Sequence, residues 1–154
     1  MSSTGTRNLL RAGMATTVLV ALLPVLDAAT VDSIGDHVRD AYPDWPADSV
    51  AADRAAITGY LVALGLLGAI GWAWTLRLLP RRPARARTVA ATLLVLGAAM
   101  ALTTLSYGGE AYDTIVPLQY GLLGLVPVGF GVAAVVRLWQ HAASAESREA
   151  LRTL

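Results

Sequence analysis

The sequence predicts an all-α fold: a polytopic integral membrane protein whose single domain, residues 1–154, is a four-helix transmembrane bundle with both termini in the cytoplasm. Three observations predict this class. Hydrophobic residues make up 55% of the chain and charged residues only 15%, which is unusually apolar for a soluble domain. The charges are clustered, and a chain of this size has too little interior to bury the long uncharged runs between them. Arginine is concentrated in alternate connecting segments, which indicates an orientation in a bilayer.

Four apolar runs are each long enough to cross a membrane as a helix. About 20 mostly apolar residues cover ~30 Å of hydrocarbon. The runs are continuous rather than alternating, which favours helices over the strands of a membrane barrel. The predicted spans cover residues 9–26, 57–79, 88–107 and 115–138.

The first span has an alternative interpretation. Arg7 and Arg11 followed by an apolar run are also typical of a signal peptide. No good cleavage site follows, because Asp27 stands where a small residue is preferred. An uncleaved span is therefore favoured, while cleavage would leave three spans and an external N-terminus.

The orientation follows from the arginines, since their excess in short loops marks the cytoplasmic side. Ten of them lie on one side of the predicted spans: Arg7, Arg11, Arg77, Arg81, Arg82, Arg85, Arg87, Arg137, Arg148 and Arg152. Only Arg39 and Arg54 lie on the other. The loop 80–87 and the tail 139–154 are thus predicted to be cytoplasmic and the loop 27–56 external. The use of arginine without any lysine is typical of a bacterium, so the predicted location is the bacterial plasma membrane.

The external loop contains a candidate contact for a partner. Apolar residues at positions 31, 34, 38 and 42 recur at helical spacing, which predicts a short helix lying on the membrane. His37, Tyr42 and Trp45 are the aromatic side chains that this loop could present. A single histidine without converging ligands predicts no metal site, and no cofactor is expected.

A second candidate site is a polar pocket at the outer end of the bundle. It would form if the polar residues near the outer ends of the spans came together. The predicted members are Asp27, Thr103, Ser106, Glu110, Asp113 and Gln119.

Glycines at helical spacing predict where the spans pack against one another, because membrane helices associate through close approach of small residues. Gly65 and Gly68 form one stripe in the second span, and Gly97 with Ala101 offers a matching groove in the third. The fourth span adds a stripe of Gly121, Gly124 and Gly131.

The sequence excludes several functional classes. There is no cysteine, and hence no thiol chemistry or disulfide. No catalytic motif is present. A net charge of +1 gives no indication of a basic surface that binds nucleic acid. The leading hypothesis is a non-enzymatic binding or accessory protein for a lipid-like ligand or a membrane-protein partner. The alternatives are a small transporter or channel subunit acting as a homo-oligomer, and a membrane enzyme acting on an apolar substrate.

Overall fold

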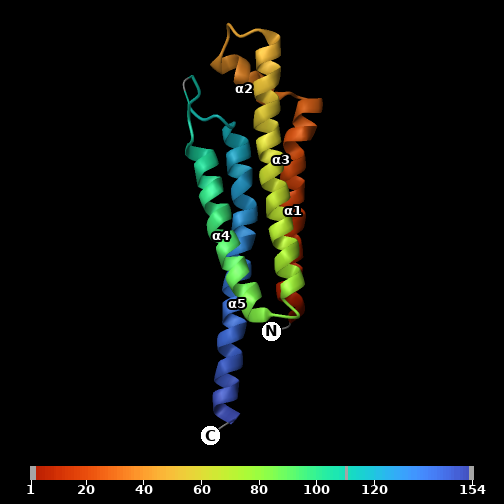
Figure 1. The fold of residues 1–154 in the computed structure, drawn as a ribbon, viewed down its shortest axis with the longest axis vertical. Coiled ribbons are helices and arrows are strands. Elements are labelled where there is room, and N and C mark those ends of the chain that lie inside the picture. Colours follow the sequence, from red (N-terminus) through yellow and green to blue (C-terminus); the bar gives the residue numbers. More distant parts are fainter. Residues whose placement is uncertain (1–2, 110, 153–154) are drawn as a thin grey trace.

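The computed structural model describes residues 3–109 and 111–152 and is all-α in those residues (Figure 1). Its helices are α1 (Ser3–Ala29), α2 (Ser33–Ala41), α3 (Ala47–Leu78), α4 (Pro83–Ser106) and α5 (Leu118–Arg152). Four of them, all except α2, are long and apolar enough to cross a membrane. The predictions of an all-α fold and of four apolar spans are confirmed.

The long helices extend beyond the apolar runs that predicted them. α3 begins at Ala47, well before the predicted span. Its first turns carry Asp48 and Asp53, and because they are polar the apolar run did not include them. Apolar runs mark the part of a helix that suits lipid, not the whole helix. α4 begins with Pro83 in its first turn, where proline is favoured because its missing N–H would have no partner there.

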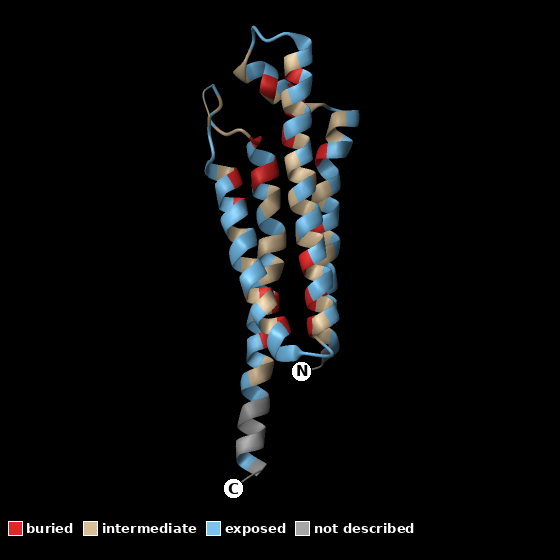
Figure 2. Ribbon diagram, viewed as in Figure 1, coloured by how far each residue is buried: buried red, intermediate tan, exposed pale blue. Residues whose placement is uncertain are grey.

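The four long helices lie side by side, and α2 lies across one end of them (Figure 1). α1 packs against α3 and α5, and α4 also packs against α5. The boundary between α3 and α4 is the least extensively packed of the four. Many of the outward-facing residues are exposed, as Figure 2 shows along all four helices. Leu19, Leu67 and Val95 are 64%, 66% and 68% exposed, as expected for surfaces that meet lipid.

The boundary between α1 and α3 is closed by small residues. A Cβ added at Gly65 would lie 2.2 Å from Cβ of Ala21, and one added at Gly68 would lie 3.0 Å from Cγ2 of Thr17. Since Trp72 covers Gly13 in the same way, with ring atoms 2.6 Å from an added Cβ, the two helices meet at three successive levels. We call this the α1–α3 seam.

The seam corrects one prediction. The partner of the Gly65 stripe is α1, whereas the sequence had suggested the groove at Gly97 in the third span. α1 provides Gly13, Thr17 and Ala21 at four-residue spacing on one face. That spacing was present in the sequence, but a stripe with one glycine is a weaker signal than a stripe with several.

The other four glycines predicted to support helix packing divide into two groups. An added Cβ at Gly121 would lie 2.6 Å from Leu105, and one at Gly131 would lie 3.0 Å from Leu94, so both permit close packing of α5 on α4. At Gly97 and Gly124 an added Cβ would meet no described atom within 4 Å. These two glycines therefore do not make the close helix contact expected of them.

Candidate functional site: the outer cap and the lateral cavity

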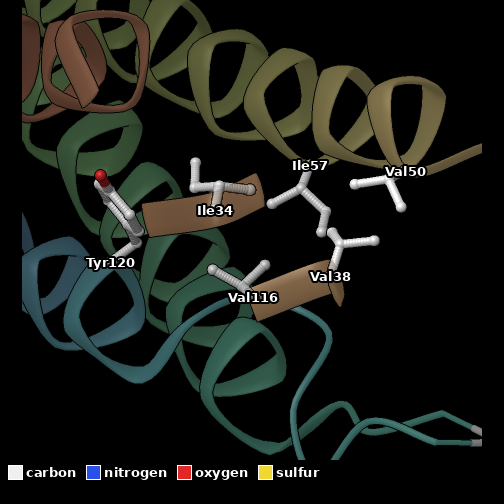
Figure 3. Close-up of a cluster of buried hydrophobic side chains, with 6 residues drawn as sticks. All are labelled: Ile34, Val38, Val50, Ile57, Val116 and Tyr120. Carbon is white, nitrogen blue, oxygen red and sulfur yellow. The ribbon is translucent and has the colours of Figure 1, made fainter. Parts of the chain in front are cut away.

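The helix predicted in the external loop is present, but it does not lie free on a membrane surface. Ile34 and Val38 of α2 are fully buried. They pack on the end of the bundle in a cluster, drawn in Figure 3, with Val50, Ile57, Val116 and Tyr120. The apolar face of α2 thus meets α3, α5 and the loop before α5. We call α2 and the described part of the α4–α5 loop (residues 107–109 and 111–117) the outer cap, after the side of the membrane that the sequence predicts for it.

Asp32 fixes the start of α2. It adopts a left-handed backbone conformation with φ of 59°, which Asp and Asn tolerate better than most residues. Its carboxylate accepts hydrogen bonds from Arg54 at 2.9 Å and from Arg39 at 3.1 Å. Burial tends to raise the pKa of Asp32, but the two arginines outweigh it and hold the pKa below its usual value. The bond to Arg54 ties the outer cap to α3.

The three predicted loop residues are brought together around Tyr112. The His37 ring stacks on Tyr112 at 5.2 Å, and Tyr42 meets Tyr112 edge-on at the same distance. Trp45 stacks on Tyr42 with ring centroids 3.9 Å apart. Their contacts are largely internal, and only Trp45 is an exposed side chain.

Tyr112 and His37 also hold the cap by hydrogen bonds. The Tyr112 hydroxyl donates to Asp53 of α3 at 2.6 Å, and a ring N–H of His37 donates to the Thr114 carbonyl at 2.9 Å. Burial, together with the Asp53 carboxylate, raises the pKa of Tyr112. The sequence did not identify Tyr112, because its role depends on a contact between segments far apart in the chain. These bonds make the aromatic cluster part of the structure of the cap.

Among the described residues of the predicted outer polar pocket, no hydrogen bond joins one member to another. Thr103, Ser106 and Asp113 are exposed, and Ser106 donates to the Leu102 carbonyl of its own helix. Glu110 lies outside the described residues.

The two remaining members of that predicted pocket support α2. Asp27 accepts a hydrogen bond from the Ile34 backbone N–H at 3.3 Å, and the Gln119 amide donates to Ser33 Oγ at 3.3 Å. Within the described part of the chain, no group of three or more acidic or histidine residues could hold a metal ion.

A hollow within the helix bundle was not predicted. It is a cavity of about 720 Å³ within the bundle, lined by all four long helices. Its inner wall is formed by α1 and α5, whose lining residues, such as Pro24, Pro127 and Val128, are buried or half-buried. The lining residues of α3 and α4 include exposed ones, such as Ile70 and Leu96. The cavity therefore opens sideways between α3 and α4, and we call it the lateral cavity.

Gly97 and Gly124 line this cavity. The absence of their side chains leaves the space open, which explains why an added Cβ would meet nothing there. In a sequence, a glycine that lets two helices touch cannot be told from one that leaves a hollow between them. The cavity was missed for this reason.

Few polar groups in the wall of the lateral cavity are left to hydrogen-bond with a ligand. Thr17, Thr75 and Thr104 donate to the carbonyls of Gly13, Gly71 and Met100 in their own helices. Thr104 Oγ1 also lies 2.8 Å from the Tyr60 hydroxyl, and Thr17 accepts from Trp72 Nε1 at 2.9 Å. Among the described lining residues there is no acidic, basic or histidine side chain. The surface suits an apolar occupant.

The lateral cavity is long. Along α4 its lining runs from Thr88 to Thr104, about 24 Å at the helical rise of 1.5 Å per residue. That is most of the ~30 Å thickness of bilayer hydrocarbon. At the end covered by α2, Tyr120 belongs both to the lining and to the buried cluster under α2. The outer cap therefore closes this end.

Comparisons with protein-family models, with curated proteins and with solved structures found no significant match. The described structure has four helices long and apolar enough to cross a membrane, which indicates a multi-pass membrane protein, and nothing narrower follows from likeness to other proteins.

Proposed function

We propose that the protein is a non-enzymatic, multi-pass protein of the bacterial plasma membrane that binds an apolar, lipid-like molecule in the lateral cavity. The observation that carries the proposal is the cavity itself: about 720 Å³, lined by four helices and free of charged lining residues among those described. This volume lies within the range of roughly 300–1,000 Å³ typical of small-molecule sites. Its elongated, apolar form suits a hydrocarbon chain lying along the bundle axis.

The orientation belongs to the same proposal. The arginine distribution supports a cytoplasmic position for both termini and for the α3–α4 turn, with the outer cap outside. A reporter fused after Arg82 is expected to read as cytoplasmic and one inserted near Asp44 as external. The reverse pattern would overturn this topology.

Native mass spectrometry of the protein, extracted gently from its own membrane, tests the binding. The wild type is expected to retain a small apolar molecule. Gly124→Leu would fill the cavity, because an added Cβ there meets no described atom. This variant is expected to lose most of the retained molecule and to keep its fold, since leucine favours a helix more than glycine does.

Gly129→Leu is the matched control. Gly129 lies on the same helix and also has open space around an added Cβ, but it does not line the cavity. This variant should retain the molecule as the wild type does. A wild-type oligomer without any retained molecule would contradict the proposal and favour the transport alternative.

A further inference from the structure

We infer that the occupant of the lateral cavity is an anionic amphiphile, a lipid whose negatively charged headgroup lies at the arginine-rich end of the bundle between Arg77 and Arg85. This inference rests on the proposed function and specifies its ligand class. It follows from the shape of the cavity and from where the charges lie at its two ends.

A headgroup has no room at the capped end. Ile34 and Val38 seal that end with the buried cluster of Figure 3. The segments around the seal carry aspartates, including Asp36, Asp40 and Asp48, which would repel an anion. A chain in the cavity must therefore direct its polar end toward the α3–α4 turn.

The opposite end is basic. The α3–α4 turn and the helix segments next to it carry Arg77, Arg81, Arg82, Arg85 and Arg87. The ion pairs in the described structure involve Arg39 and Arg54 at the capped end. None of the turn arginines pairs with a described carboxylate, although Arg87 lies over the Trp139 ring at 5.6 Å. These charges are therefore available to an external anion.

Two of these arginines continue the rims of the cavity opening. On α3, Ile70 and Trp74 line the cavity. Arg77 lies seven and three residues after them and therefore shares their helix face. On α4, Thr88 and Thr92 line the cavity. Arg85 lies three and seven residues before them and shares their helix face. Arg77 and Arg85 are exposed. They flank the point where a headgroup would leave the apolar wall.

The test is the affinity of the full chain in mild detergent for two lipids with identical acyl chains, anionic phosphatidylglycerol and zwitterionic phosphatidylcholine, measured by native mass spectrometry. Phosphatidylglycerol is expected to bind more tightly. Arg77→Gln with Arg85→Gln should weaken its binding by about tenfold or more, because each arginine near a lipid surface contributes appreciably. Binding of phosphatidylcholine should stay the same.

Arg7→Gln with Arg137→Gln is the control, because it removes the same charge elsewhere. The Arg137 guanidinium lies 3.7 Å from a Cβ added at Gly5 of α1, away from the α3–α4 opening. This control should keep the preference for the anionic lipid. An equal loss in both double variants would indicate general surface attraction and overturn the inference.

Gly124→Leu separates this inference from the proposed function. If the wild type binds both lipids equally and Gly124→Leu loses both, the headgroup inference fails and the proposed function stands. If Gly124→Leu binds both lipids as the wild type does, the proposed function itself fails.

Discussion

The two sides of α3 differ in how they meet their neighbours. Toward α1, small residues bring the helices together at three levels, with Gly65 facing Ala21 and Trp72 lying over Gly13. Toward α4, the packing is less extensive. Leu93 covers Gly71 there, but elsewhere the helices leave the lateral cavity, which Gly97 lines. Both sides are apolar and contain glycine. The difference teaches that a glycine permits close contact only where a side chain of the partner helix covers it, and otherwise leaves space.

The largest expected effect comes from adding one methyl group on each side. Gly65→Ala would place Cβ 2.2 Å from Ala21 Cβ, so the seam must separate, and we expect a loss of about 2 kcal/mol in the free energy of unfolding. Gly97→Ala meets open space and should be neutral or slightly stabilising, because alanine favours a helix. The two variants are compared by measuring their melting temperatures in detergent. Equal effects would mean that the seam is not tightly packed.

A smaller effect is expected from removing one hydroxyl on each side. Thr17→Val at the seam deletes the acceptor of the Trp72 Nε1–H bond, which is 2.9 Å long. We expect this to cost about 1 kcal/mol, since the indole N–H is left unpaired.

The matched substitution on the open side is Thr88→Val. The exposed Thr88 hydroxyl donates only weakly, at 3.4 Å, to the Ala84 carbonyl of its own helix. Its melting temperature should stay close to that of the wild type. A larger loss at Thr88 than at Thr17 would reverse the comparison.

The smallest effect concerns the outer cap, which closes one end of the open side. The folded state lowers the pKa of Asp32 below the ordinary value of 3.8. A lowered carboxyl pKa gives stability that is present above the unfolded pKa and is lost as the pH falls through the folded one. Asp32→Asn keeps a residue that tolerates the left-handed conformation and removes this charge.

The melting temperature of Asp32→Asn should lie slightly below that of the wild type at neutral pH, by the equivalent of about 0.5 kcal/mol, because ion pairs near the surface contribute little. The gap should narrow as the pH falls below about 4 and through the lowered pKa of Asp32. A gap that stays constant from pH 7 to pH 3 would show that the Asp32 charge does not stabilise the cap.

The sequence predicted the parts of this molecule that depend on local composition. Apolar runs located the four long helices, and helical spacing located α2. It did not predict that Ile34 and Val38 would pack on the bundle, because an apolar face suits lipid and protein equally well. His37, Tyr42 and Trp45 were identified, but their common neighbour Tyr112 was not, since that contact joins distant segments. The lateral cavity depends on what is missing at Gly97 and Gly124, and only the arrangement of four helices reveals it.

The sideways opening between α3 and α4 has a consequence for how the cavity would be loaded. A molecule entering there arrives by diffusion in the plane of the membrane and does not need to cross water. Its occupancy would then depend on its mole fraction among the surrounding lipids, not on its concentration in the cytoplasm or outside the cell. Under the proposed function, the ligand would enter and leave from the membrane while the outer cap stays closed.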